Sequence, residues 1–310
     1  MELRRPDRTE DFEAVLTLMQ ACDLAVYGDT DWTEQELREE WEGLDLEQNA
    51  WLAVDGDALV GVMHLSEIRD GRIITDGYVH PVHTGRGAGT LLLAAVESRA
   101  RELEPGLAPG KRVYLESAHL VGDPGAPALF SSREYQRVRK FFRMVRALEQ
   151  PEPQPVLPTG LEIRAFDPDA HGPRLHAAFE EAFASEWGHN PQSYQAWREK
   201  VIGWSRFEAS LFVVVWAGAE IVAFSLNYDK RMGDWGWIGS VGVRPAWRRQ
   251  GLGLALLQES FRRFGDRGES TAALGVDSEN PTGATRLYER AGMTVLWRAD
   301  VWQKELRAGD

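Results

Sequence analysis

Residues 248–253 form a short basic turn, Arg248-Arg249-Gln250-Gly251-Leu252-Gly253, that could hold a phosphate group. The turn follows an apolar segment that stops at a proline, and it precedes a segment with helical apolar periodicity. The first amide N–H groups of a helix have no partner within the helix and lie at the positive end of its dipole, so they can bind an anion. Two arginines beside these donors add full positive charges. The turn therefore predicts a pyrophosphate-binding site.

Two common nucleotide-binding motifs are excluded by the residue types in this turn. A P-loop needs a lysine followed by Ser or Thr, and the turn contains no lysine. A dinucleotide-binding fingerprint needs a third glycine, and Leu256 stands at that position. By itself the turn leaves open an ordinary strand–turn–helix connection without a ligand.

A second segment, residues 277–292, contains side chains that suit acyl-transfer chemistry. Asn280 precedes a proline, as a helix N-cap often does, and Tyr288 falls on the apolar face of the helix that follows. Gly292 is expected to end that helix. A phenol is neutral at physiological pH and can protonate a leaving group. Taken alone, Asn280 is explained equally well as a cap and Tyr288 as a core aromatic residue.

Together, the turn and this segment resemble the coenzyme A-binding motifs of the GNAT superfamily of acyl-CoA-dependent N-acyltransferases. The shared pattern is Arg-x-x-Gly-x-Gly after a Val-x-Val-x-Pro strand, and then Asn, seven residues and Tyr. The resemblance implies that Asn280 contacts the pantetheine arm, that Tyr288 protonates the departing thiolate, and that acetyl-CoA is the donor. It assigns coenzyme A binding in this half to Val241, Gly242, Val243, Arg248, Arg249, Gln250, Gly251, Leu252, Gly253, Leu254 and Asn280.

The first half of the chain repeats these motifs in a degraded form. Thr84 stands where the second half has Arg248, and Phe130 aligns with Tyr288. Because phenylalanine has no proton to donate, the first half is expected to be degenerate. It either still binds coenzyme A or only shapes the acceptor pocket of the second half. The residues assigned to such binding are Val79, Gly85, Arg86, Gly87, Ala88, Gly89 and Thr90.

The order of predicted elements is the same in both halves. Each half begins with a strand and two helices, the second of which opens in the first half with a capping box at residues 33–36. A hairpin comes next, and then a strand that leads into the glycine turn and a long helix (88–103 or 252–264). Each half ends with a fifth strand, a short helix and a terminal β segment. The order predicts an α/β fold of two tandem GNAT-like domains, each a mixed, mostly antiparallel sheet flanked by helices. The expected domains are residues 1–148 and the catalytic residues 161–310, joined by a proline-rich linker at 149–160.

A general base is missing from the position where the family often carries a glutamate. The corresponding strand, residues 235–241, contains no carboxylate. The nearest candidates are Asp229, Asp234, Glu186 and His189. A water chain, or an amine that arrives neutral, would need no side-chain base.

Composition excludes several other classes of protein. A net charge of −13 over 310 residues argues against a nucleic-acid-binding surface, and a single cysteine excludes a cysteine-based metal site. No metal is expected, and His80 and His83 are interpreted as surface residues. The N-terminus lacks the apolar run of a signal peptide, and no apolar stretch is long enough to span a membrane. A cytoplasmic monomer that acts as an internal pseudo-dimer is therefore expected.

The leading hypothesis is transfer of an acetyl group from acetyl-CoA to a primary amine of a small molecule by direct attack, with Tyr288 as the general acid. Tryptophans on the expected acceptor side, including Trp187, Trp204, Trp235 and Trp237, would suit an aromatic-walled pocket. Two alternatives stay open at this point. One is a non-catalytic protein that binds or senses acyl-CoA, and the other is an acetyltransferase that acts on a protein amine.

Overall fold

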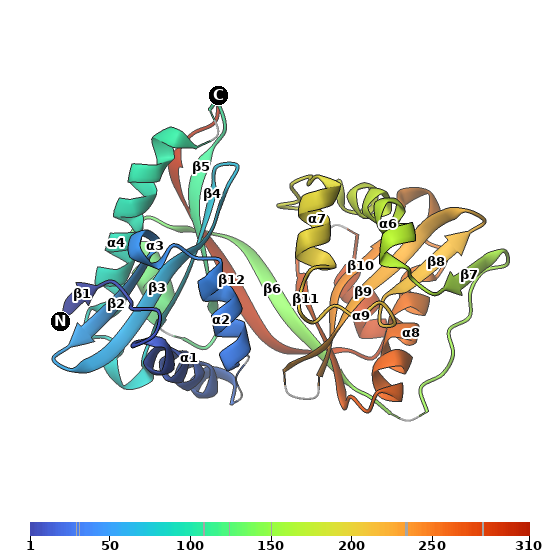
Figure 1. The fold of residues 1–310 in the computed structure, drawn as a ribbon, viewed down its shortest axis with the longest axis horizontal. Coiled ribbons are helices and arrows are strands. Elements are labelled where there is room, and N and C mark those ends of the chain that lie inside the picture. Colours follow the sequence, from blue (N-terminus) through green and yellow to red (C-terminus); the bar gives the residue numbers. More distant parts are fainter. Residues whose placement is uncertain are drawn as a thin grey trace. The chain divides into compact units, whose positions relative to one another are not determined.

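The computed structural model describes residues 1–28, 30, 32–107, 109–123, 125–149, 151–232, 235–280 and 282–310. These residues form two compact units. Unit 1 contains residues 1–140 and 297–310, and unit 2 contains residues 141–296. Each unit is a β-sheet covered by helices on both faces (Figure 1).

The sheet of unit 1 has the strand order β1-β2-β3-β4-β5-β12. Its strands β4 and β5 are parallel, and the other neighbours in this order are antiparallel. The strands are β1 (Glu2–Arg4), β2 (Ala50–Asp55), β3 (Ala58–Arg69), β4 (Arg72–Val79), β5 (Val113–Leu120) and part of β12 (Thr294–Arg307). The helices are α1 (Phe12–Tyr27), α2 (Glu34–Glu42), α3 (Leu46–Asn49), α4 (Ala88–Leu103) and α5 (Gly125–Ser132), with 3-10 turns η1 (Pro81–His83) and η2 (Glu104–Gly106).

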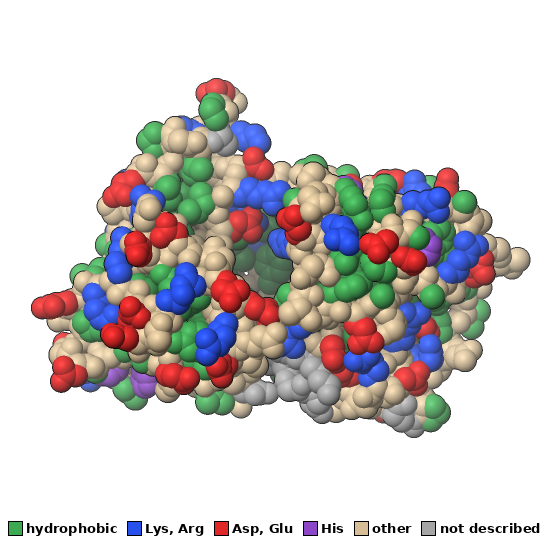
Figure 2. Space-filling view, viewed as in Figure 1, with side chains coloured by type: hydrophobic (Ala, Val, Ile, Leu, Met, Phe, Trp, Pro, Cys, Tyr) green, Lys and Arg blue, Asp and Glu red, His purple; other side chains and the backbone are tan. Residues whose placement is uncertain are grey.

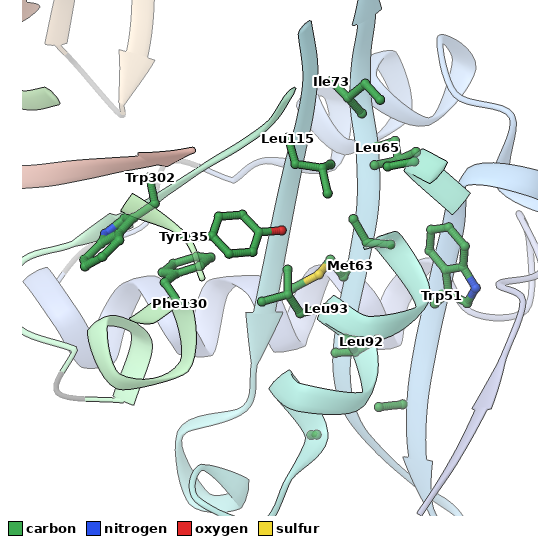
Figure 3. Close-up of a cluster of buried hydrophobic side chains, with 14 of the residues drawn as sticks. Trp51, Met63, Leu65, Ile73, Leu92, Leu93, Leu115, Phe130, Tyr135 and Trp302 are labelled. Carbon is green, nitrogen blue, oxygen red and sulfur yellow. The ribbon is translucent and has the colours of Figure 1, made fainter. Parts of the chain in front are cut away.

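Alternation of side chains along β3 divides the core of unit 1 into two layers. Met63 and Leu65 pack with Leu92 and Leu93 of α4, whereas Val62 packs on the opposite face with α1 and α2. Successive residues of a strand point to opposite faces, so one strand can serve both layers. Figure 3 shows the layer beneath α4.

The sheet of unit 2 has the strand order β6-β11-β10-β9-β8-β7. Strands β10 and β11 are parallel, and the other neighbours in this order are antiparallel. The strands are part of β6 (Gln136–Ala147), then β7 (Leu161–Arg164), β8 (Val213–Ala217), β9 (Glu220–Met232), β10 (Trp235–Val243) and β11 (Thr271–Asp277). The helices are α6 (Pro168–Phe183), α7 (Tyr194–Val201), α8 (Leu252–Asp266) and α9 (Ala284–Arg290), with a 3-10 turn η3 (Pro245–Trp247).

Helices cover both faces of the sheet of unit 2 (Figure 1), and a core layer lies on each face. Trp216 and Phe224 pack with α6 and α7 on one face. Val215 packs with Leu256 of α8 on the other, and Phe264 and Tyr288 extend that layer. The predicted fold class, a mixed and mostly antiparallel sheet with flanking helices in each of two repeats, is confirmed.

The compact units differ from the predicted domains at their ends. Residues 141–147 of β6 pair with β11 in unit 2, although the sequence places them in the first domain. Residues 299–307 of β12 pair with β5 in unit 1, although the sequence places them in the second. Each unit therefore contains the terminal strand of the other half, because the sheet of each unit is completed by that strand.

Acidic and basic side chains are interspersed over both units on the face that Figure 2 shows. Within the described part of the chain, no helix is both long and apolar enough to cross a membrane.

Candidate active site

The predicted pyrophosphate-binding turn connects β10 to α8 in unit 2. After η3 the chain enters α8 at Leu252, and Gly251 is the N-cap residue of this helix with a φ of 83°. Because the N-cap residue is a glycine, it has no side chain that could cap this helix end. The amide N–H groups of the first turn of α8 therefore point out of the helix without intrahelical partners. Such an end suits an anion.

Glycine is favoured at the two positions of the turn for different structural reasons. A Cβ atom on Gly251 would meet nothing within 4 Å, but its positive φ is a conformation that favours glycine. A Cβ atom on Gly253 would lie 2.7 Å from Cδ2 of Leu287 in α9. Gly253 thus allows α8 and α9 to pack closely, which joins the turn to the helix that carries Tyr288.

The basic residues of the turn also differ in their surroundings. Arg248 is partly buried, and its guanidinium donates hydrogen bonds to the carbonyl oxygens of Val243 (3.1 Å) and Ala182 (2.9 Å). Arg248 therefore holds the turn against the end of β10 and the end of α6. Arg249 and Gln250 are exposed beside it. Their predicted contacts with a pyrophosphate stay a prediction.

Strands β10 and β11 separate after Ile238, within the strand that leads to this turn. Their parallel register runs from Trp235 opposite Thr271 to Ile238 opposite Leu274, and an irregularity follows between Ile238 and Ser240. A β-bulge bends a strand and re-aims its groups. Gly239 and Gly275, although they lie on inner strands of the sheet, are exposed at this point. We call this separation of the two strands the fork.

Beyond the fork, residues 240–243 of β10 continue to pair with β9. The parallel register with β11 has ended by then, so one edge of this segment faces the fork. Val241, Gly242 and Val243, which the sequence assigns to the pantetheine and thioester, lie in this segment. An extended ligand can form strand-like hydrogen bonds with such an edge.

Arg143 and Trp237 line the α6–α7 face of the fork, a contact that the sequence did not indicate. Arg143 of β6 lies opposite Gly275, and its guanidinium carbon is 4.8 Å from the ring centroid of Trp237. The contact is a cation–π interaction. Because Arg143 belongs to the terminal strand of the first half, only the pairing of β6 with β11 reveals it.

Asn280 is not the N-cap of α9, and this expectation from the sequence is wrong. The N-cap is Gly283, with a φ of 75°, and the helix begins at Ala284. The side-chain oxygen of Asn280 instead accepts a hydrogen bond from the backbone N–H of Thr282 at 2.8 Å. This local turn uses the oxygen that would otherwise cap the helix. Pro281, which motivated the prediction, lies outside the described residues.

The side-chain amide of Asn280 donates to Oε2 of Glu186 at 2.8 Å. Glu186 belongs to the loop between α6 and α7, so this bond joins the predicted acceptor loop to the segment after β11. Burial raises the pKa of the Glu186 carboxyl, and Asp277 adds to this effect, while Arg248, His189 and Asn280 oppose it.

Tyr288 lies on α9 and is buried with 8% of its surface exposed, against Leu257 and Met293. The predicted end of its helix is confirmed, because Gly292 has a φ of 85° and its N–H bonds to the carbonyl of Glu289. Burial raises the pKa of the Tyr288 phenol, and the nearby Glu186 charge raises it further. The phenol is therefore protonated at physiological pH.

The other candidate bases have different partners. His189 lies 3.0 Å from the Glu180 carboxylate, and Asp229 forms an ion pair with Arg267 at 3.2 Å. Asp234 lies outside the described residues. Of the three described candidates, Glu186 is the one that bonds to Asn280.

Unit 1 repeats the glycine turn at the start of α4. Gly87 is the N-cap with a φ of 93°, Gly85 also has a positive φ, and a Cβ atom on Gly89 would lie 3.1 Å from Leu129 of α5. The parallel register of β4 with β5 likewise covers only Arg72 to Ile74. The carbonyl oxygen of Val79 accepts a hydrogen bond from the Cys22 thiol at 3.3 Å.

Phe130 occupies the position of unit 1 that corresponds to Tyr288. Its ring stacks on Trp302 with centroids 5.6 Å apart and contacts Tyr135 at 5.2 Å (Figure 3). Gly89 and Gly253 face Leu129 and Leu287, the residues that directly precede Phe130 and Tyr288. This agreement supports the alignment of Phe130 with Tyr288 in three dimensions.

Comparison with known proteins identifies both repeats. The family model of the GNAT acetyltransferases matches residues 12–118 and 173–293. The chain is 35% identical over 305 residues to the mycothiol acetyltransferase of Thermobispora bispora, covering 94% of this chain and 95% of that protein. It is 32% identical to the mycothiol acetyltransferase of Streptomyces scabiei, covering 72% of this chain and 68% of that protein.

Solved structures share the same tandem architecture. A GCN5-related N-acetyltransferase from Sphaerobacter thermophilus matches with a TM-score of 0.88 and 34% identity, covering 100% of this chain and 96% of that one. A tandem GNAT protein from the clavulanic acid biosynthesis pathway matches with a TM-score of 0.75 and 16% identity, covering 100% and 99%, and shares the fold. With two matched repeats and relatives of this similarity along its length, the chain belongs to the GNAT family of acetyltransferases.

Proposed function

We propose that this enzyme transfers the acetyl group of acetyl-CoA to a primary amine of a small molecule and that the reaction takes place in unit 2. The proposal rests on one observation, that unit 2 combines three features. The uncapped end of α8, the free edge of β10 at the fork, and the Asn280–Tyr288 segment belong to one compact unit. These parts could bind a pyrophosphate, an extended arm and a leaving thiolate, respectively.

The reaction needs one proton removed and one supplied. The amine nitrogen bonds to the thioester carbonyl carbon, and backbone N–H groups at the edge of β10 stabilise the oxyanion that forms. The carbon–sulfur bond then breaks, and the Tyr288 hydroxyl gives its proton to the leaving thiolate. The nitrogen loses one proton, so the products are an amide and coenzyme A.

Glu186 is the side chain that we assign as the acceptor of the amine proton. Its pKa is raised by burial, which brings a carboxylate closer to the working pH of a general base. Its hydrogen bond to Asn280 places it beside the segment that carries Tyr288. His189 already contacts the Glu180 carboxylate and Asp229 already forms an ion pair with Arg267, which suits a structural role better.

The first half of the chain is assigned a binding role without chemistry. Gly87 and the start of α4 keep the geometry of an anion site, and Phe130 replaces the acid. We therefore expect two coenzyme A molecules per chain and turnover in unit 2 alone. Equilibrium dialysis would test the stoichiometry, and one bound molecule would contradict this assignment.

Thiol release from acetyl-CoA across a panel of small amines tests the proposed function. The names of the relatives make a mycothiol-type acceptor one member of the panel. Release that depends on an amine and falls in Tyr288→Phe supports the proposal. Stabilisation of the fold by coenzyme A without turnover on any amine would favour a binding or sensing protein.

A further inference from the structure

Three side chains of unit 1 converge on the face of the sheet that α1 and α2 cover. Glu40 comes from α2, His64 from β3 and Asp76 from β4. His64 and Asp76 are directly opposite in the antiparallel register of β3 and β4, so their side chains leave the sheet on the same face. Each of the three residues offers one nitrogen or oxygen atom, and these atoms lie within 4.8 Å of one another.

The environment of this cluster is strongly acidic. The His64 side chain is 3% exposed, and its Nε2 atom lies 2.8 Å from Oε1 of Glu40, whose side chain is 26% exposed. The carboxylates of Glu40 and Asp76 both act on His64 as negative charges. Two carboxylates near one imidazole in a partly buried site favour a positive charge among them.

Ser66 holds the Asp76 carboxylate in place, and Thr75 bonds to the backbone of His64. The Ser66 hydroxyl donates to Oδ2 of Asp76 at 2.6 Å, and the Thr75 hydroxyl donates to the backbone carbonyl of His64 at 2.9 Å. The register of β3 and β4 is irregular between Leu65 and Glu67, at Ser66. A hydrogen bond such as that from Ser66 to the Asp76 carboxylate orients metal ligands in proteins, and bulges re-aim side chains near functional sites.

We propose that Glu40, His64 and Asp76 bind a divalent transition-metal ion, with Zn²⁺ as the expected ion. One imidazole nitrogen and two carboxylate oxygens, without a thiolate, form a donor set that zinc and manganese accept. Metal–ligand bonds of about 2.1 Å in tetrahedral geometry place neighbouring ligand atoms roughly 3.4 Å apart. Glu40 can adjust to this spacing because it is long and partly exposed.

An ion bound there would take the place of the proton in the His64–Glu40 hydrogen bond. It would connect α2 directly to β3 and β4, and it would leave a coordination position for water on the partly exposed side of the cluster. The site is independent of the proposed chemistry, because all three ligands belong to unit 1.

Zinc binding by the full chain tests this site. The protein is stripped with a chelator, titrated with Zn²⁺ by calorimetry, and its bound metal is measured by elemental analysis. We expect one Zn²⁺ per chain. Because removing even an outer-shell partner weakens metal binding about 10- to 100-fold, loss of a ligand in Asp76→Asn or His64→Gln should weaken it about 100-fold or more.

Two features of the variants keep the test decisive. Asp76→Asn leaves the His64–Glu40 hydrogen bond intact, so its fold, followed by circular dichroism, should persist even if His64→Gln unfolds. The double variant His80→Ala/His83→Ala removes a pair of imidazoles whose ring centroids lie 5.7 Å apart elsewhere in unit 1. It should bind Zn²⁺ as the wild type does. Equal binding by wild type and Asp76→Asn, loss of binding in the His80/His83 variant, or no binding by the wild type would each overturn the proposal.

Discussion

Replacing Tyr288 with phenylalanine removes a single hydroxyl group and tests the assigned acid. The ring is 8% exposed and packs against Leu257 and Met293, and phenylalanine keeps these contacts. The free energy of unfolding should therefore change by no more than about 1 kcal/mol, the usual net value of one hydrogen bond. A fall in activity would then reflect lost chemistry.

The expected fall in kcat is about 100-fold, at the lower end of the range for general acids. We expect the lower end of the range because burial, and then the Glu186 charge, raise the pKa of the phenol above its ordinary value. An ordinary thiol has a pKa of about 8.5, so the phenol is the weaker acid and transfers its proton to the thiolate at a disadvantage. The raised pKa also keeps the phenol protonated at higher pH, so it should cause no loss of rate below about pH 10.

The assay is thiol release from saturating acetyl-CoA with the best amine of the panel, together with the KM for acetyl-CoA, which should not change. Tyr135→Phe is the matched control, because Tyr135 is a buried tyrosine of unit 1, 4% exposed, against Phe130. A Tyr288→Phe rate within about twofold of wild type, where about 100-fold is expected of a general acid, would refute the reasoning. An equal loss in Tyr135→Phe would also refute it.

Three further perturbations test other parts of the site and fold. In the wild type, kcat/KM should rise with pH through the pKa of Glu186, which burial raises. Glu186→Gln should lose this pH dependence and react about 10- to 100-fold more slowly. A variant with the pH profile of the wild type would exclude Glu186 as the base. Gly251→Ala should lower the free energy of unfolding by about 1 kcal/mol and weaken coenzyme A binding in unit 2, because the φ of Gly251 is 83°. Gly87→Ala should have the same two effects in unit 1 only. Calorimetric titration with coenzyme A distinguishes the binding sites of the two units. Burial raises the pKa of Glu97, but Arg133 and Lys304 outweigh burial and lower it. The stability that Glu97 contributes is thus present above its unfolded pKa and is lost as pH falls through the lower folded value. Urea unfolding of Glu97→Gln should show a loss of about 3–5 kcal/mol at pH 7 and a smaller loss in acid, and a pH-independent difference would contradict this account.

Local elements could be predicted from the sequence because their causes are local. The helix expected at residues 88–103 is α4, and the capping box at Thr33 and Glu36 is present. The hairpin expected in each half is present, formed by β2 and β3 in the first half and by β8 and β9 in the second. Apolar periodicity, capping residues and turn residues act over a few positions, so one sequence suffices to recognise them.

Contacts between distant segments could not be predicted in this way. The cap role assigned to Asn280 is wrong because the N–H of Thr282 bonds to its side-chain oxygen and Gly283 is the N-cap of the helix. The contact of Asn280 with Glu186 joins residues 94 positions apart. No periodicity or motif spacing connects such a pair, so only folding places the acceptor loop beside the segment after β11.

The sequence by itself determined the family and the duplication, because the Gly-x-Gly turn and the Asn–Tyr spacing are short-range patterns that can be recognised along the chain. It also proposed Tyr288 as the acid, and this role stays a prediction. Only the tertiary structure decided which strand completes each sheet, since β6 and β12 pair by long-range register. It also brought Arg143 to the fork and gathered Glu40, His64 and Asp76 into one cluster. Side chains from separate strands and helices meet through packing, and one-dimensional spacing does not record that packing.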